Sequence, residues 1–327
     1  PTLPSALPRP CSSLRNSCRK NKGSVSYLAD IKPSKRLEVQ VNIDKKRLVG
    51  LVRDFSSLRV AVVGDIALDV YHYGHIRLSG ESAAITVTVD EKKTRRMLGC
   101  AGNVAANVSA LGSQVTLYGV LGPKNESARV IFENLCAQQK IALFGAEGEQ
   151  TIIKTRFLSV EHGAHLFRAD FGEYVDILEY LRASDSLSES ARGWMFEKLS
   201  KNVGSYSGMF FSDYDKAVFR NICESDLFTL CRVSGKVTVV DLKPQHAHLF
   251  KGATLARVNF KEAQSITGRL SVSAGRANIA YILKAHVQTR YAAVSLGKNG
   301  LVISDYGEVI PTKARVMFDV TGAGDTV

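Results

Sequence analysis

The sequence lacks the features of membrane-spanning, disulfide-rich and zinc-binding proteins. It contains no run of about 18 apolar residues, which a membrane-spanning helix requires. Its six cysteines are scattered and form no Cys-x-x-Cys pair, so their spacing predicts neither a zinc site nor a disulfide framework. Isolated thiols are typical of a reducing compartment. We therefore expect a soluble intracellular protein with no membrane partner.

Acidic residues are missing from positions 1–27, where five Lys and Arg lie among many serines. Such a segment cannot bury a core, and its composition is typical of organelle transit peptides. It is read as a targeting segment or as a disordered extension, with a nucleic-acid-binding arm as a third, less favoured alternative. A transit peptide would place the protein in an organelle matrix or stroma, and its absence would leave the protein in the cytoplasm.

The positive charge is unevenly distributed. Residues 1–50 hold 11 Lys and Arg against 3 Asp and Glu, a net +8 of the total +12, so only +4 is left for the other 277 residues. A basic tail on a nearly balanced domain differs from a basic nucleic-acid-binding face. We predict a basic extension over 1–48, one globular domain over 49–327 and no nucleic-acid partner.

Short apolar runs alternate with segments of helical length in the globular part. This alternation predicts a mostly parallel sheet with helices on both faces. Ligands bind such sheets at the carboxyl ends of the strands, where Asp65, Asp213, Asp241 and Asn259 fall. We predict helices at about 44–56, 103–111 and 125–139, strands at 59–65, 85–89, 115–120, 208–212, 237–241, 253–258 and 292–295, and a hairpin of 155–160 with 165–170.

The last ten residues contain Gly322, Ala323 and Gly324 followed by Asp325. Small residues let successive backbone N–H groups converge on one anion, and a following helix would add its positive end. A carboxylate beside such an anion hole can take a proton from a hydroxyl, which indicates phosphoryl transfer to an alcohol. The alternative is a plain glycine-rich turn before a helix.

Upstream polar residues could hold a sugar. Asp65 and Asp69 follow a strand, and carboxylates there can accept hydrogen bonds from hydroxyl groups. Gly99 and Asn103 stand at a predicted helix start, where backbone amides and the Asn103 amide can reach a ligand. The alternatives are a helix cap or solvated turn for the two acids and a simple N-cap for Asn103.

Two further groups could bind charged ligands. Asn259 and Glu262 lie three apart, on one face if a helix begins there, which suits Mg²⁺ held through water; the alternative is a cap and a surface Glu. Lys154, Arg156 and Arg168 lie on the hairpin and could grip an anionic group; the alternative is solvated charge on an edge strand.

One short motif is set aside. His72-Tyr73-Gly74-His75 resembles the HxGH signature of nucleotidyl transferases, whose later motifs are not recognisable in this sequence. We interpret it as a coincidental match in a loop.

Taken in order, these segments resemble the ribokinase-like (PfkB) carbohydrate kinases over about residues 50–327. Asp319–Asp325 resembles the family's D-x-T-G-A-G-D signature, and Asn259–Glu262 its N-x-x-E motif. Ser295–Gly300 is similar to its nucleotide-side glycine turn, and Gly99–Asn103 to its substrate-side GG…N motif. Each motif alone is weak, but four in the right order are specific.

Within the family, the sequence is most similar to the heptose-7-phosphate kinase domain of bacterial ADP-heptose synthesis. The similar segments are Val63–Asp69 with Tyr71 and Tyr73-Gly74, Asn103–Asn107, Lys154–Arg156, Arg168–Phe171, Ser212–Lys216, Asp241–Lys243 and Asp319–Val327. The resemblance implies a ribokinase-like three-layer α/β domain with a mostly parallel sheet and a small β-lid. The lid segments would be about 76–98 and 155–170, and the lid often makes a homodimer contact.

The resemblance also implies ATP and Mg²⁺ as cofactors and a role for each site residue. Asp325 would be the catalytic base, with Gly322, Ala323 and Gly324 as the anion hole. The substrate-binding set would be Asp65, Asp69, Gly99, Asn103, Lys154, Arg156 and Arg168. The nucleotide-binding set would be Asp213, Lys216, Lys243, Asn259, Glu262, Ser295, Gly297 and Gly300, with Asn259 and Glu262 serving Mg²⁺ through water.

The expected reaction is ATP-dependent phosphorylation of a phosphosugar such as D-glycero-D-manno-heptose 7-phosphate. One alternative is a ribokinase, fructokinase or nucleoside kinase that acts on an unphosphorylated substrate. Another is a catalytically silent family member that serves as a binding subunit.

Three departures from the family pattern are visible. Cys100 stands at the second glycine of the GG pair, where its side chain would crowd the sugar or force a backbone change. Leu78–Ser82 lacks the prolines usual in heptose kinases. The sequence ends two residues after Asp325, so we expect a fragment of a longer protein, in which a nucleotidyltransferase domain could follow.

Overall fold

The computed structural model describes residues 44–78, 85–161, 164–172, 187–216, 218–219, 227–268, 278–306 and 308–312. All of them belong to the compact unit Val41–Val327. The basic segment 1–27 and the motif 322–325 lie outside the described residues. The structural statements below concern the described residues alone.

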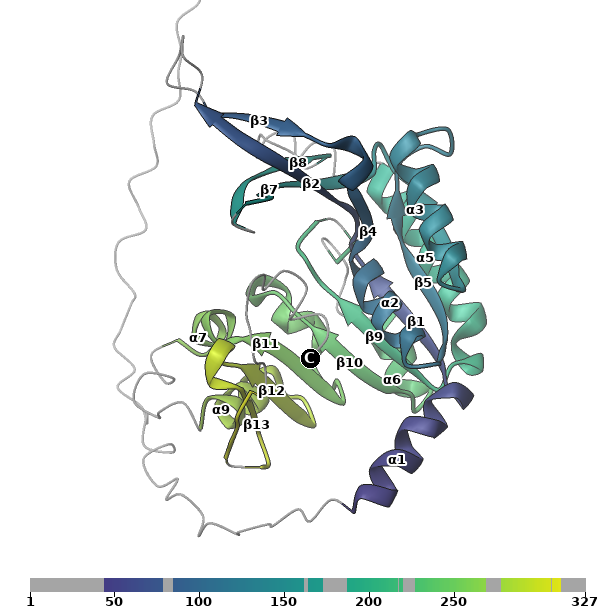
Figure 1. Ribbon diagram of the computed structural model, residues 1–327. Helices are drawn as coiled ribbons and strands as arrows, with labels where there is room; N and C mark the ends of the chain where they lie inside the picture. The colour runs from purple at the N-terminus through teal and green to yellow at the C-terminus, as the bar shows by residue number, and fades with distance from the viewer. Residues whose placement is uncertain are drawn as a thin grey trace, which may run out of the picture. The chain divides into compact units, whose positions relative to one another are not determined.

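The main sheet has the strand order β14-β13-β12-β11-β10-β9-β1-β5-β6. Figure 1 labels the strands from β13 to β5. All strands from β12 to β6 run parallel, and only β13 and β14 are antiparallel. The sheet therefore brings seven carboxyl ends to one edge. The strands are β1 (Arg59–Gly64), β5 (Gln114–Leu121), β6 (Ile141–Glu147), β9 (Gly208–Ser212), β10 (Val237–Asp241), β11 (Leu255–Asn259), β12 (Tyr291–Ser295), β13 (Leu301–Ile303) and β14 (Val309–Ile310).

Helices cover both faces of this sheet, because successive strand residues point to opposite sides. In β1, Val62 packs into one hydrophobic core, whereas Ala61 and Val63 pack into the other. Helices α2 (Ala101–Ala110) and α3 (Ser127–Gln138) complete the first core. Helices α5 (Leu187–Asn202), α6 (Leu227–Val233), α7 (Phe260–Thr267) and α9 (Ile279–Val287) contribute to the second. The three-layer α/β prediction is confirmed.

A second, smaller sheet begins directly after β1 of the main sheet. Only Asp65 separates β1 from β2, and the small sheet has the order β3-β2-β7-β8 with β4 also paired to β2. We call it the lid sheet. Its strands are β2 (Ile66–Leu78), β3 (Ile85–Val89), β4 (Arg95–Cys100), β7 (Ile152–Ser159) and β8 (His165–Phe171).

The predicted loop at His72–His75 is wrong, because these residues form the middle of β2. Polar side chains on this strand have cross-strand partners: His72 bonds Thr94, and His75 pairs with Glu161. Those partners lie 22 and 86 residues away, so the local pattern did not reveal a strand. The lid sheet accordingly begins at Ile66 and includes residues 95–100, beyond the predicted 76–98.

Other element boundaries follow the predictions closely. Helix α1 (Lys45–Asp54) lies in the predicted range, but α2 begins at Ala101, two residues early. Strands β2, β4, β6, β13 and β14 were not predicted. Short 3-10 helices occur at Phe55–Ser57, Glu91–Lys93, Val203–Ser205, Pro244–Phe250 and Gly297–Asn299. None of the helices in the described part of the chain is long and apolar enough to cross a membrane.

The join between β1 and β9 can be tested at Gly64. A Cβ added there would lie 2.1 Å from the Ser212 carbonyl oxygen, and overpacking of this kind costs about 1–3 kcal/mol. We expect Gly64→Ala to lower the melting temperature in thermal unfolding. Gly50→Ala in α1 is the matched control: nothing lies within 4 Å of its added Cβ, and Ala is favoured over Gly by about 1 kcal/mol in helices. Equal effects of the two substitutions would contradict the packing argument.

Candidate active site

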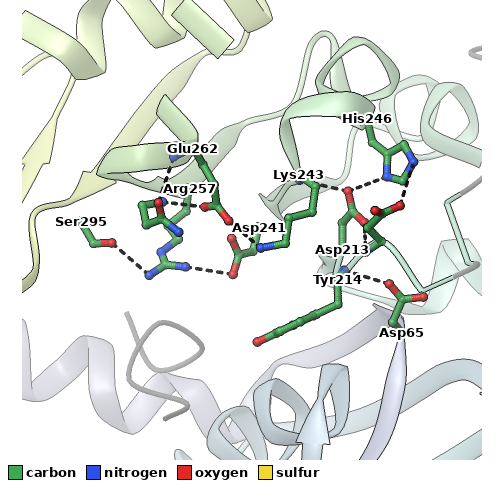
Figure 2. Close-up of polar contacts among 11 residues, drawn as sticks. Asp65, Asp213, Tyr214, Asp241, Lys243, His246, Arg257, Glu262 and Ser295 are labelled. Atoms are coloured by element: carbon green, nitrogen blue, oxygen red, sulfur yellow. Dashed lines mark hydrogen bonds and ion pairs between the residues drawn. The ribbon is translucent and has the colours of Figure 1, made fainter. Parts of the chain in front are cut away.

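Polar residues gather at the carboxyl ends of β1, β9, β10, β11 and β12 in the main sheet, and Figure 2 shows their side chains. Register places Gly64 beside Ser212, Ser212 beside Asp241, and Asp241 beside Arg257. Asn259, the last residue of β11, is paired with Ser295, the last residue of β12. Residues that are far apart in sequence therefore meet at one edge, as the predicted β–α alternation requires.

Asp65 is buried at the junction of β1 and β2, with 2% of its surface exposed. One carboxylate oxygen accepts the backbone N–H groups of Tyr214 (2.8 Å) and Lys216 (3.1 Å), and the other accepts that of Val218 (3.1 Å). Burial raises the pKa of Asp65, and these three amides offset part of that rise. The contacts fix the loop after β9 (residues 213–216 and 218–219), which we call the β9 loop.

Asp213 and His246 form a second buried pair beside this loop. His246 Nδ1 lies 2.9 Å from Asp213 Oδ2, and His246 Nε2 lies 3.8 Å from Asp215. Asp213 also accepts the backbone N–H groups of Asp215 and Lys243. Burial lowers the pKa of His246, but Asp213, Asp215 and Asp65 outweigh it and raise that pKa above 6.5. No sequence motif contains His246, and its key partner lies 33 residues away.

Asn259 and Glu262 lie at the start of α7, where a helix was expected. Asn259 Oδ1 accepts the Glu262 backbone N–H at 2.9 Å, and Glu262 Oε2 accepts the Asn259 backbone N–H at 2.9 Å. This reciprocal pair is a capping box. Glu262 Oε1 lies 2.5 Å from Lys243 Nζ, so the structure joins three of the predicted nucleotide-side residues.

Arg257 is a partly buried arginine in β11 that sequence reasoning missed. Its Nη1 donates to Asp241 Oδ2 at 3.0 Å, and its Nη2 donates to the Ser295 hydroxyl at 3.1 Å. It thereby joins the ends of β10, β11 and β12 (Figure 2). A charged residue inside an otherwise apolar strand was the signal that could have identified it.

A glycine turn follows β12 on this side of the site. Gly297 and Gly300 have φ values of 59° and 98°, which favour glycine. At Gly300 a Cβ would also lie 1.9 Å from the Ile310 carbonyl oxygen. Both predicted glycines therefore shape the turn beside Ser295.

On the lid side, Asp69 pairs with Arg156 across β2 and β7. Arg156 Nη1 lies 2.8 Å from Asp69 Oδ1, and its guanidinium group lies over the Tyr71 ring at 5.1 Å. A Cβ on Gly99 would lie 2.8 Å from the Asp69 carboxyl carbon. Gly99 therefore leaves the room that the Asp69 carboxylate occupies.

Lys154 links the lid sheet to the β9 loop. Its Nζ lies 3.1 Å from Cys100 Sγ and 5.0 Å from the centre of the Tyr214 ring. Lys243 Nζ lies 5.5 Å from the same ring. Tyr214, which no prediction singled out, therefore contacts a lysine of the predicted substrate side and a lysine of the predicted nucleotide side.

The remaining predicted residues are placed as follows. Arg168 lies opposite Arg156 in β8, is about half exposed and pairs with Asp170. Asn103 lies in the first turn of α2, but the N-cap position is Cys100, so the alternative of Asn103 as an N-cap is wrong. Asp325 and 322–324 lie outside the described residues.

The described donors suit a hydrated cation better than a protein-built metal cage. No group of three or more His, Cys, Asp and Glu in the described part could hold a metal. The side chains of Asn259 and Glu262 carry hard oxygen atoms beside Lys243, and Mg²⁺ commonly binds through one or two carboxylates while it keeps several waters. These residues therefore fit Mg²⁺ bound together with phosphates.

A mostly parallel sheet with a polar carboxyl edge is typical of α/β proteins that bind ligands at the ends of their strands. The sequence matches the pfkB family carbohydrate kinase model over residues 57–327. The chain belongs to this family, and it is a carbohydrate kinase domain whose acceptor is an alcohol group. The predicted family resemblance is confirmed.

Relatives and solved structures agree with this assignment. The chain is 33% identical over 278 residues to the bifunctional protein HldE of Pseudomonas putida (strain W619), covering 84% of this chain and 54% of that protein. It is 30% identical over 279 residues to HldE of Desulfatibacillum aliphaticivorans, with the same coverage. The chain thus spans about half the length of these relatives.

Two solved structures show the shared fold. Phosphofructokinase-2 from Escherichia coli, in complex with substrates and products, has a TM-score of 0.60 at 17% identity, covering 82% of this chain and 83% of that one. A carbohydrate kinase from Agrobacterium tumefaciens has a TM-score of 0.56 at 16% identity, covering 82% and 80%.

The Asp213–His246 pair makes the stability of the domain depend on pH. Because the folded-state pKa of His246 is raised above 6.5, its stabilising effect is complete below the unfolded pKa and is lost as pH rises through the folded pKa. We expect His246→Asn to lower the melting temperature by several degrees at pH 6 and by less at pH 8.5. The exposed His248 provides the control, since His248→Asn should have little effect at either pH. A larger loss at pH 8.5 would contradict this sign.

Proposed function

We propose that this carbohydrate kinase transfers the γ-phosphoryl group of ATP to a hydroxyl of a phosphosugar, with a heptose 7-phosphate as its substrate. The observation that carries the proposal is the face of β7 that buries two cations. Lys154 and Arg156 are 7% and 5% exposed, and register places Lys154 opposite Asp69. Cations and a carboxylate together suit an acceptor that carries both a phosphate and hydroxyl groups.

On the sugar side, Asp69 would accept hydrogen bonds from hydroxyl groups, and Asn103 would assist from α2. Gly99 would keep the space beside the Asp69 carboxylate open. Asp65 would act indirectly, because its carboxylate accepts three backbone amides of the β9 loop. Lys154 and Arg156 would face the substrate phosphate, with Arg168 at the outer end of the same sheet.

On the nucleotide side, Lys243 and the glycine turn after β12 would contact the phosphates and the nucleotide. Asp213 and Lys216 would support that contact from the β9 loop. Asn259 and Glu262 would hold Mg²⁺ through water, and Lys243, now paired with Glu262, would then be released to a phosphate oxygen. When bound, Mg²⁺ supplies positive charge that neutralises the phosphates.

For the chemical step, Asp325 would take the proton from the acceptor hydroxyl. The backbone amides of 322–324 would stabilise negative charge on the transferred group. These roles rest on the family signature at residues 319–325, which lies outside the described residues.

The lid sheet is also the proposed homodimer contact. Its exposed apolar side chains include Ile76, Met97, Phe167 and Phe171, and burial of such side chains is a common basis of subunit contacts.

The second activity implied by the word "bifunctional" in the names of the relatives would require residues beyond those matched here.

Substrate preference tests the proposal directly. Charge-assisted hydrogen bonds contribute about 1.5–3 kcal/mol, so we expect kcat/KM for heptose 7-phosphate to exceed that for the unphosphorylated heptose by about 10–100-fold. Arg168→Ala should raise the KM for the phosphosugar, by less than Lys154→Met because Arg168 is half exposed. A preference for ribose, fructose or a nucleoside would favour the alternative kinase classes.

The catalytic role of Asp325 separates a kinase from a silent binding subunit. Loss of a positioned general base costs about 10²–10⁴-fold in rate, so Asp325→Asn in the intact protein should reduce sugar-dependent ATP consumption by that order. Asp305→Asn is the control, because Asp305 is exposed and pairs with Lys284 away from the site. A rate unaffected by Asp325→Asn would remove Asp325 from the mechanism.

A further inference from the structure

Cys100 adopts a backbone conformation that normally belongs to glycine. It joins β4 to α2 with φ 53° and ψ −128°. Gln288, with φ 59° and ψ 45°, lies in the left-handed helical region that other residues occasionally visit. Cys100 lies far from that region in ψ, where a Cβ is unfavourable. Cys100 therefore adopts a glycine-like conformation and bears its strain.

The side chain of Cys100 is used in a specific contact. Its Sγ lies 3.1 Å from Lys154 Nζ, and the two residues are 54 positions apart in the sequence. Both are buried, with 5% and 7% of their surfaces exposed. Burial raises the pKa of the Cys100 thiol to about 12, although Lys154 acts to lower it. The Lys154 ammonium therefore donates to a neutral sulfur atom rather than pairing with a thiolate.

The contact restricts a long side chain. A lysine has a flexible four-carbon stem, and here its ammonium group touches the Cys100 sulfur on one strand end and the Tyr214 ring on the β9 loop. Tyr214 is in turn held by its backbone bond to Asp65. Backbone strain that persists in a folded protein commonly marks a functional constraint. Here the strained residue is Cys100, whose sulfur atom contacts the Lys154 ammonium group.

We propose that Cys100 is a positioning residue that fixes the Lys154 ammonium at the sugar side of the site and so sets the preference for an anionic acceptor. The inference rests on the proposed function. Cys100 does not contact the reacting atoms; it acts through Lys154.

Three substitutions separate positioning from packing. Cys100→Gly relieves the backbone strain and removes the sulfur, so the melting temperature should be kept or raised while the KM for heptose 7-phosphate rises about tenfold. Cys100→Ser keeps a hydrogen-bond acceptor and should restore most of the affinity. Cys100→Ala keeps the strain without the acceptor and should raise KM without a gain in melting temperature. In all three, kcat and the KM for ATP should change little.

Cys136→Ser is the matched control for loss of a buried thiol, because Cys136 lies in the core of α3. It should lower the melting temperature and leave both KM values unchanged. If Cys100→Gly leaves the KM for the phosphosugar unchanged, or if affinity and melting temperature fall together in Cys100→Gly, Cys100 is a packing residue and the proposal fails.

A measurement without substrate keeps this test distinct from that of the proposed function. Labelling of Lys154 by an amine-reactive reagent, followed by peptide mass spectrometry, reports how firmly its ammonium group is held. We expect labelling to be several-fold faster in Cys100→Ala and close to wild type in Cys100→Ser. Equal rates in these two variants overturn the positioning role. If Lys154 is labelled slowly in the wild type but the enzyme shows no preference for the phosphosugar, the positioning role of Cys100 stands. The proposed substrate is then refuted.

Discussion

The buried Asp65 carboxylate is the interaction on which the rest of the site depends. It stands at the single residue between the main sheet and the lid sheet, and its two oxygens accept three backbone amides of the β9 loop. A buried carboxylate is costly unless its acceptors are satisfied, so the buried Asp65 and the β9 loop stabilise one another. The loop in turn carries Tyr214, whose ring contacts Lys154 of the lid and Lys243 of the nucleotide side.

Charge is distributed in pairs around this loop. Asp69 holds Arg156, Asp241 holds Arg257, Glu262 holds Lys243, and Asp213 holds His246. Each pair joins two different segments, so the four pairs cross-link the polar edge. Such pairs can also exchange partners when a phosphate or a cation arrives, which suits the proposed binding of ATP and a phosphosugar.

Local patterns predicted the residues whose partners are close in sequence. Asn259 and Glu262 were found because a capping box spans only three positions. Asp69 was predicted as a site residue, but the strand that contains it, β2, was not predicted. The polar side chains of β2 have partners up to 87 residues away in the sequence, so the local pattern did not indicate a strand. His246, Arg257 and Tyr214 were missed for the same reason. Lys154 and Arg156 were predicted as basic hairpin residues, yet their burial and their partners came only from the pairing of β7 with β2.

The sequence by itself determined the parallel α/β architecture, the polar strand ends and the kinase family, because periodicity and short motifs are local properties. Only the tertiary structure decided that Asp65 holds a loop and that Cys100 occupies a glycine-like conformation against Lys154. The physical reason is register: a hydrogen bond forms only when strand pairing brings donor and acceptor within about 3 Å of each other, and no local pattern specifies that distance.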